Sequence, residues 1–403
     1  MPHEINLITT IAAALGLAMI FGFIAARLKV PPLVGYLLAG IVIGPNTRGF
    51  VADMELAAQL AEIGVMLLMF GVGLHFSLDD LASVRGIALP GAVVQIVVAT
   101  ALGTATGMLW GWSFGAGLVF GLTLSVASTV VLLRALEARG ILESFNGRIA
   151  VGWLIVEDLV TILVLVLLPP LANVLGGDAE GAPPGGGIGS ALAITFAKVG
   201  AFMVLMLMLG RRLFPRLLWL VAKTGSRELF TLCVVAAAVG VAYGAAVLFG
   251  VSFALGAFFA GMMMRESSFS HRAADESLPL RDAFAVLFFV SVGMLFDPAV
   301  LVEEPLAVLG VVVIIMFGKT LAAIGLVLLL RYPLNTALTV GAGLAQIGEF
   351  SFILAALGVE YGLLPEEGQS LILAGALISI ALNPAVFAAI EPAQRWIRSR
   401  SEL

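Results

Sequence analysis

The chain has 403 residues, of which 61% are apolar and 12% are charged, and its mean hydropathy is +1.11. Soluble domains are about 25% charged, so this composition excludes a soluble enzyme and a disordered protein. With 21 basic and 26 acidic residues there is no cationic excess to neutralise phosphates, which excludes a nucleic-acid binder. The single cysteine and the three histidines fit neither an internal disulfide nor a zinc pattern, so no metal cluster or other cofactor is expected.

Thirteen apolar stretches have a length suited to crossing a bilayer, for which a helix needs about 20 residues. The charge-free run 229–264 is too long for one helix, so we divide it near Gly244–Gly250. The first stretch has no basic start and no clear cleavage site, so we interpret it as a span and not as a signal peptide. The expected spans lie near 6–26, 32–47, 56–76, 87–110, 114–134, 149–171, 190–210, 228–246, 250–264, 283–297, 306–330, 335–358 and 368–391.

The basic residues fall on alternate loops between these spans. With the N-terminus outside, all of them except Arg48, Lys198 and Lys319 lie in inner loops or in the C-terminal tail. This asymmetry is what the positive-inside rule requires. The sequence therefore predicts an all-α polytopic membrane protein with an outer N-terminus and a cytoplasmic C-terminus.

Two sets of six spans resemble each other weakly. Residues 33–44 resemble 253–264, and residues 67–81 resemble 287–301. One extra span between the sets inverts the second set, and inverted repeats typify secondary transporters; the alternative is coincidence between glycine-containing helix pairs. We expect one transport domain, 1–403, made of a first repeat 1–171, a linker with the seventh span 172–227, a second repeat 228–391 and a cytoplasmic tail 392–403.

Glu157 and Asp158 form an acidic pair near the middle of the sixth span. A charge at the bilayer centre costs at least ~2.5–3.5 kcal/mol, so the pair needs a reason to be there. Two adjacent carboxylates cannot both stay charged in a dry site, and they would titrate as a coupled pair. Such a pair is suited to exchanging protons for a small cation. The alternative is a buried pair that is neutralised by a basic partner and serves only packing.

Lys319 lies at the middle of the eleventh span and is the obvious basic counter-charge for the acidic pair. A lysine that reaches an interface with its ammonium group is the alternative interpretation, and its central position argues against it. Lys198, in the seventh span, lies nearer an end and outside both repeats, so we interpret it as structural.

Polar residues interrupt two further spans at corresponding places in the two sets. Glycines at 341, 343 and 348 make unwinding easy in the second case, and unwound backbone can coordinate a cation. Ordinary bonding of Ser and Thr to the preceding helical turn is the alternative. The residues concerned are Ser125, Ser128 and Thr129 in the fifth span, and Gln346, Glu349 and Ser351 in the twelfth.

Five stretches carry a specific resemblance. They read PPLVGYLLAGIVIGP, AEIGVMLLMFGVGLHFSLDDL, STVVLLRALEARG, GWLIVEDL and LAQIGEFSFIL. In these stretches the chain resembles the Kef-type monovalent cation:proton antiporters and, within that family, the YbaL-like subgroup of the bacterial inner membrane. The resemblance implies a fold related to the sodium/proton antiporters, with crossing broken fifth and twelfth helices in a six-helix core, and a homodimer.

The resemblance also implies roles for particular residues. Asp158 matches the ion-binding aspartate of the family, with Glu157 before it, and Lys319 resembles the lysine that pairs with the acidic pair in electrogenic sodium/proton relatives. Glutathione-gated Kef proteins tend to have glutamine at the position of Glu157, so the chain departs from them there. Relatives often continue into a cytoplasmic nucleotide-binding regulatory domain. Since the chain ends after Arg400 with no such motif, we expect a short member or one from which that domain is missing.

We therefore expect an antiporter, not an enzyme, that exchanges H⁺ for a monovalent cation by alternating access. The cation or the proton would bind at Asp158 with Glu157, supported by Lys319 and the polar breaks, and the resemblance favours K⁺ over Na⁺. A cation channel and a symporter for a small organic anion are the alternatives. The absence of a filter-like carbonyl motif argues against the first, and the acidic pair argues against the second.

Overall fold

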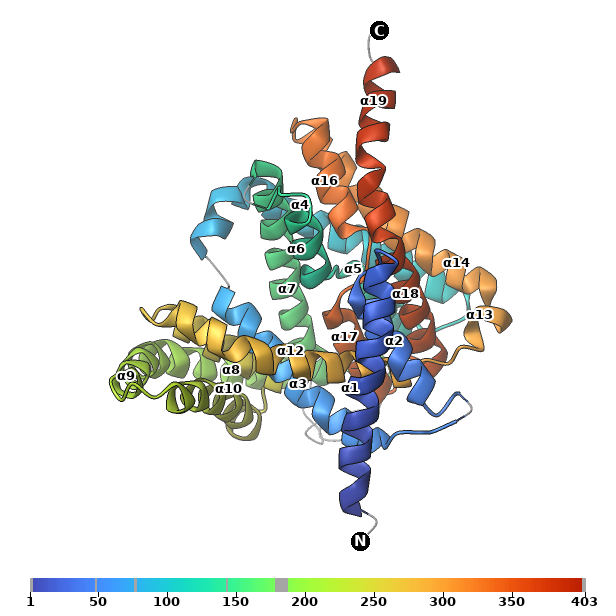
Figure 1. The fold of residues 1–403 in the computed structure, drawn as a ribbon. Coiled ribbons are helices and arrows are strands. Elements are labelled where there is room, and N and C mark those ends of the chain that lie inside the picture. Colours follow the sequence, from blue (N-terminus) through green and yellow to red (C-terminus); the bar gives the residue numbers. More distant parts are fainter. Residues whose placement is uncertain (1–2, 48, 76–77, 143, 178–187, 401–403) are drawn as a thin grey trace. The chain divides into compact units, whose positions relative to one another are not determined.

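The computed structural model describes residues 3–47, 49–75, 78–142, 144–177 and 188–400, and all regular structure in them is helical (Figure 1). The predicted all-α fold class is therefore confirmed. The helices are α1 (His3–Arg27), α2 (Pro32–Ile43), α3 (Met54–His75), α4 (Leu78–Leu109), α5 (Phe114–Ser125), α6 (Thr129–Glu137), α7 (Phe145–Leu171), α8 (Ile188–Leu205), α9 (Arg211–Ala222), α10 (Arg227–Phe249), α11 (Phe253–Arg265), α12 (Ser270–Met294), α13 (Val300–Glu303), α14 (Pro305–Val313), α15 (Lys319–Leu329), α16 (Leu334–Leu344), α17 (Glu349–Glu360), α18 (Glu366–Ala388) and α19 (Ile390–Arg400), with π-helical turns η1 (Met206–Gly210) and η2 (Ile314–Gly318).

Each of the thirteen predicted spans overlaps helix in the structure. Within the described residues, ten helical segments are long and apolar enough to cross a membrane. The pair α16 and α17, bent by 43° at a short break, makes up to eleven, and α2 and α11 are shorter apolar helices. The total of thirteen crossings stays a prediction. Arg48 and residues 178–187 of the predicted linker lie outside the described residues.

The chain forms two compact units. Unit 1 comprises residues 1–21, 36–77 and 182–295, and unit 2 comprises residues 22–35, 78–181 and 296–403. Each unit thus takes segments from both halves of the sequence. Unit 2 contains the predicted spans near 87–110, 114–134, 149–171, 306–330, 335–358 and 368–391, which include every residue expected at the ion site. The predicted division into repeats stays a prediction.

Serines begin three consecutive helices of unit 2. Ser113 Oγ accepts the Ala116 N–H at the start of α5, Ser128 Oγ accepts the Val131 N–H at the start of α6, and Ser144 Oγ accepts the Gly147 N–H at the start of α7. Such caps satisfy backbone donors that have no partner within the helix. The serine at position 128 therefore allows a new helix to start with only three residues between it and the end of α5 at Ser125.

Glycines allow close helix packing in unit 1. A Cβ built on Gly73 of α3 would overlap the Phe258 carbonyl oxygen of α11, and a Cβ on Gly261 of α11 would overlap the Phe70 carbonyl oxygen of α3. Gly40 of α2 and Gly293 of α12 approach each other in the same way. Gly40 and Gly73 lie in the two stretches that resemble those containing Gly261 and Gly293. Such reciprocal contacts are expected of two copies related by a two-fold axis, and the repeat itself stays a prediction.

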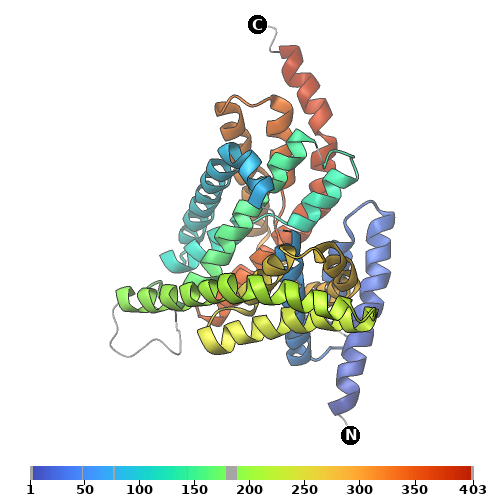
Figure 2. The same cartoon turned by 90° about the vertical axis from the view of Figure 1, so that its left-hand side faces the viewer.

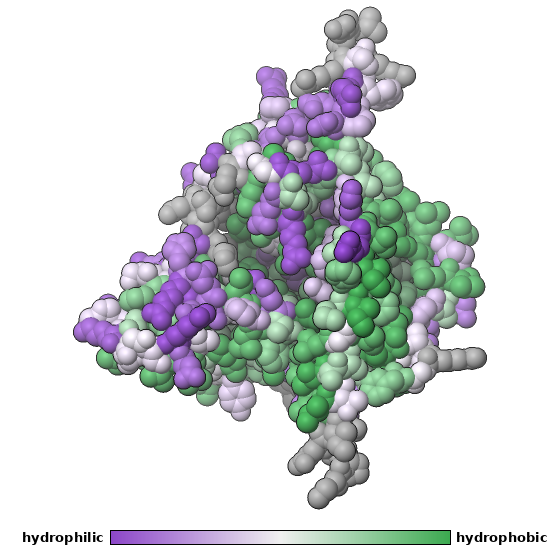
Figure 3. All heavy atoms as spheres, viewed as in Figure 1, coloured by the Kyte–Doolittle hydropathy of each residue, from purple (hydrophilic) through white to green (hydrophobic). Residues whose placement is uncertain are grey.

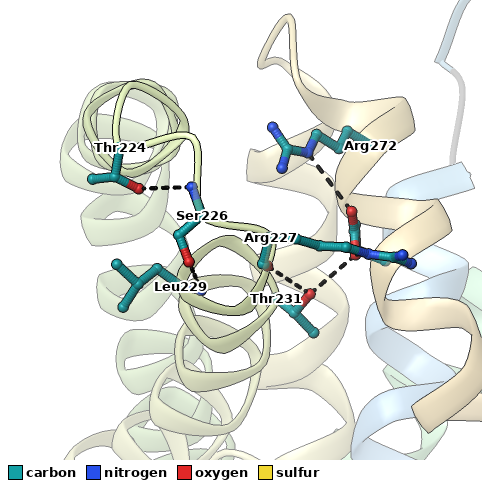
Figure 4. A network of polar contacts seen from close by, with 7 residues as sticks. Thr224, Ser226, Arg227, Leu229, Thr231 and Arg272 are labelled. Atoms are coloured by element: carbon teal, nitrogen blue, oxygen red, sulfur yellow. Dashed lines mark hydrogen bonds and ion pairs between the residues drawn. The ribbon is translucent and has the colours of Figure 1, made fainter.

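Helices α8 and α9 are joined through η1, so that residues 193–222 form one long helical segment that packs along α10 (Figure 2). A polar network connects α10 with α12 (Figure 4). Glu276 accepts hydrogen bonds from Arg227 Nε at 2.7 Å and from Thr231 Oγ1 at 3.1 Å, and Arg272 Nε lies 3.8 Å from its other oxygen. The Arg227 side chain is 79% exposed, so the network contributes little to stability and serves mainly to fix the polar end of α10 beside α12.

Apolar side chains cover outward surfaces of unit 2. Leu306 and Leu309 of α14 and Phe317 of η2 are exposed, although a soluble protein would bury such residues. The surface over α14 is accordingly apolar in Figure 3. This pattern suits contact with lipid, because acyl chains are as apolar as these side chains.

The glycine contacts in unit 1 give a first prediction. Gly73→Ala and Gly261→Ala should each lower the free energy of unfolding of the purified protein by about 1–3 kcal/mol, because the new methyl group meets backbone and the helices must move apart. Unfolding in detergent measures the change. Gly240→Ala on α10 is the matched control, since nothing lies within 4 Å of its added Cβ. Equal melting temperatures for all three variants would contradict the packing described here.

Candidate functional site

Within the described part of the chain, four ionisable side chains are buried, and all four belong to unit 2. They are Glu157 and Asp158 of α7, Lys319 at the start of α15 and Glu349 at the start of α17, each at most 4% exposed. Sequence analysis selected all four. Lys198, which we interpreted as structural, is instead exposed and belongs to unit 1.

Two broken helices meet at this site. Helix α5 ends at Ser125 and α6 begins at Thr129, and helix α16 ends at Leu344 and α17 begins at Glu349. The breaks therefore comprise residues 126–128 and 345–348, and the polar residues expected to interrupt these spans lie in them or next to them. Gly348 allows the two breaks to approach closely, because a Cβ at this position would lie 2.6 Å from the Ala127 carbonyl oxygen.

Gln346 clamps the backbone of the first break. Its Oε1 accepts the Ser128 N–H at 3.0 Å, and its Nε2 donates to the Ser128 carbonyl at 3.0 Å and to the Gly343 carbonyl at 3.1 Å. In addition, the Gly348 N–H donates to the Val126 carbonyl at 3.2 Å. The two breaks are thus hydrogen-bonded to each other although about half the chain separates them.

Lys319 joins the same two breaks from a third helix. Its Nζ donates to the Gln346 carbonyl at 2.7 Å and to the Val126 carbonyl at 3.3 Å. Among the described residues its ammonium group has no carboxylate partner within 4.0 Å, so it is not directly ion-paired with Glu157. The π-helical turn η2 directly precedes it, and such turns often occur at functional sites.

Each buried carboxylate bonds through one oxygen to the first break or to Thr129, the residue that follows it. Glu157 Oε2 accepts the Ala127 N–H at 3.0 Å, Glu349 Oε2 accepts from Ser128 Oγ at 2.9 Å, and Asp158 Oδ2 accepts from Thr129 Oγ1 at 3.0 Å. The second oxygen of each carboxylate has no hydrogen-bond partner among the described residues. For Glu157 a donor is close at hand, since the indole N–H of Trp153, one turn earlier on α7, is also unpartnered.

The charges follow the helix ends. The carboxyl-terminal ends of α5 and α16 carry partial negative charge, and Lys319 donates to carbonyls just beyond both. The amino-terminal ends of α6 and α17 carry partial positive charge. All three carboxylates accept hydrogen bonds at the start of α6, and Glu349 is also the first residue of α17. With three carboxylates and one ammonium group, the site has an excess of negative charge when all are ionised.

Several carbonyl oxygens at the breaks already have protein partners. The Val126, Ser128 and Gln346 carbonyls accept protein donors. The Ser125 carbonyl likewise accepts from Gln95 Nε2 at 2.8 Å. In contrast, among the described residues no donor to the Ala127 or Ile347 carbonyl is seen. Coordination of a cation by the unwound backbone stays a prediction. Carboxylate oxygens without a described partner also lie at the site.

Sequence analysis missed two amides that hold the broken helices. Gln95 of α4 caps α5 through the Ser125 carbonyl, and Asn383 of α18 donates to the Ala342 carbonyl near the end of α16 at 2.9 Å. Both are at most 1% exposed. A lone amide in an otherwise apolar span was the available signal, because such a group must find a partner inside the protein.

Comparison with known proteins agrees with this fold. The sodium/hydrogen exchanger transmembrane family matches residues 13–390. The chain is 60% identical to the putative cation/proton antiporter YbaL of Escherichia coli over 97% of this chain and 70% of that protein. It is 33% identical to K(+) efflux antiporter 4 of Arabidopsis thaliana over 95% of this chain and 64% of that protein.

A solved structure shows the same fold. The sodium proton antiporter MjNhaP1 of Methanocaldococcus jannaschii superposes with a TM-score of 0.76 over 96% of this chain and 98% of that one, at 16% identity. Fold and family together define a multi-pass membrane protein of the cation/proton antiporter class, and the relatives named above are transporters and not enzymes. The chain belongs to the sodium/hydrogen exchanger family.

The Gln346 clamp gives a second prediction. Gln346→Leu removes three hydrogen bonds and leaves the buried Ser128 N–H and the Gly343 carbonyl without their partner, at about 1–3 kcal/mol for each group, whereas the Ser128 carbonyl still accepts the Leu132 N–H. The melting temperature in detergent should fall strongly. Gln369→Leu on α18, half-buried and with no side-chain hydrogen bond described, should change it little. If the two variants melted together, the clamp would not hold the breaks.

Proposed function

We propose that the protein is a secondary antiporter that exchanges a monovalent cation for H⁺ by alternating access, with Asp158 as the binding group and Glu157 beside it. The observation that carries this proposal is the gathering of the buried charges of unit 2 at two hydrogen-bonded helix breaks, with open carboxylate oxygens on Asp158 and Glu349. Broken helices that hold a substrate ion are a feature of secondary transporters.

Competition between proton and cation follows from the charge excess. A buried carboxylate without compensation is costly, so each negative charge beyond the one offset by Lys319 needs a proton or a cation. Asp158 keeps one oxygen on Thr129 and has the other open, and its burial disfavours a free negative charge there. A cation that binds Asp158 therefore replaces a proton there, and the reverse step returns it.

The surrounding residues position this group. Thr129 orients Asp158, Ser128 links Glu349 to the start of α6, and Gln346 and Lys319 keep the breaks together. Ser125 ends α5 beside the site. Since all these residues belong to unit 2, that unit can carry the bound ion as one body while the site opens to one side of the membrane at a time.

We further propose K⁺ as the favoured cation and Na⁺ as the alternative. The name of the Arabidopsis relative supports K⁺, whereas the archaeal structure that shares the fold is named for sodium. We also propose a homodimer in the bacterial inner membrane, which fits the family. An N-terminus outside and a C-terminus in the cytoplasm fit the distribution of basic residues. The excess of buried negative charge disfavours an organic anion as the substrate.

Asp158→Asn should abolish exchange. The asparagine keeps the shape of the side chain but cannot release a proton, so a cation has nothing to displace. In proteoliposomes, a K⁺ or Na⁺ gradient should drive internal pH changes with the wild type and none with this variant. Asp275→Asn, at an exposed position of α12, is the control and should exchange normally. Exchange at the wild-type rate in Asp158→Asn would remove this residue from the mechanism.

Lys319→Gln should lower the melting temperature and leave the charge moved per cycle unchanged. The lysine donates to two carbonyls, so its loss weakens the contact between the breaks and leaves the negative charges less compensated. We expect a lower melting temperature, with the charge per turnover and its pH profile unchanged in the surviving protein. Currents on solid-supported membranes at several pH values measure this. A loss of voltage dependence would instead identify Lys319 as a proton carrier.

A further inference from the structure

A small cavity adjoins the first helix break in unit 2. Its volume is about 10 Å³, which corresponds to one water-sized sphere. Two polar side chains, Ser125 and Thr161, line it, and both are buried. Leu122, Val160 and Val164 also line it, and these three side chains are half-buried.

Toward an occupant of this cavity, the two hydroxyl groups can act only as hydrogen-bond acceptors or as cation ligands. Ser125 Oγ donates its hydrogen to the Leu122 carbonyl at 2.7 Å, and Thr161 Oγ1 donates its hydrogen to the Glu157 carbonyl at 2.8 Å. Since a hydroxyl has one hydrogen and two lone pairs, only lone pairs remain for an occupant of the cavity. Such a lining suits a cation, or the hydrogens of a water molecule, and repels an anion.

The cavity lies close to the proposed ion site. Thr161 follows Asp158 by three residues on α7, which places it on nearly the same helix face and about 4.5 Å farther along the axis. Ser125 is the last residue before the break that holds Asp158 through Thr129. Asp158 itself is 4% exposed and has one oxygen without a partner.

We propose that Ser125 and Thr161 form an auxiliary site for a partly dehydrated monovalent cation on its way to or from Asp158, an inference that rests on the proposed function. A cation must lose water to reach a buried carboxylate, and the hydroxyl lone pairs replace part of its hydration shell. Because these groups carry no formal charge, they hold the ion weakly enough for it to move on.

Isosteric removal of the hydroxyl groups tests the site. Thr161→Val and Ser125→Ala should each raise the KM for K⁺ about five-fold at an unchanged maximal rate and melting temperature, and the double variant should raise it further. Thr161→Ser keeps the hydroxyl and should keep the wild-type KM. Thr123→Val is the matched control, because this buried threonine of α5 donates its hydroxyl hydrogen to the Phe120 carbonyl of the same helix and does not line the cavity.

The outcomes separate this inference from the proposed function. A wild-type KM for K⁺ in both Thr161→Val and Ser125→Ala would overturn the auxiliary site, as would a lower melting temperature without a change in KM, which indicates packing alone. If Asp158→Asn is inactive in the same assay, the proposed function stands in either case. Exchange by Asp158→Asn would refute the proposed function itself, and the auxiliary site with it.

Discussion

Two helices that break inside an apolar interior leave backbone N–H and C=O groups without helical partners, and no water is at hand to replace them. In this protein the breaks satisfy each other. Gln346 binds both backbone groups of Ser128, the Gly348 N–H reaches the Val126 carbonyl, and Lys319 donates to a carbonyl from each break. Amides of two continuous helices, Gln95 and Asn383, satisfy carbonyls near the ends of α5 and α16.

The position of every buried charge follows from this arrangement. Four half-helix ends lie at the breaks, and their partial charges favour an ammonium group at two ends and carboxylates at the other two. The protein supplies one ammonium group and three carboxylates, which leaves a negative excess in a buried place. In the proposed function, this excess makes the site responsive to protons and monovalent cations. Several backbone carbonyls hold the breaks together, and the open carboxylate oxygens are the groups proposed for exchange.

Much of the site could be predicted from the sequence because charges in apolar spans are conspicuous. Glu157, Asp158 and Lys319 stand out for this reason, and the polar residues of the two breaks stand out by their corresponding positions. The partners could not be predicted, because Gln346 and Ser128 lie 218 residues apart and only the packed fold sets their register. Gln95 and Thr161 gave little signal, since a single amide or hydroxyl in an apolar span does not reveal which carbonyl it meets. The span positions followed from hydropathy, whereas the assembly of each unit from both halves of the chain depends on packing.

In the proposed function, cation and proton compete for one buried carboxylate. Proton release on cation binding tests it most directly, because it needs neither a membrane potential nor transport. When K⁺ or Na⁺ is added to the purified protein in weakly buffered detergent solution, a pH indicator should report saturable release of protons from the wild type and none from Asp158→Asn. Saturable cation binding without proton release, or equal release from the variant, would contradict the account.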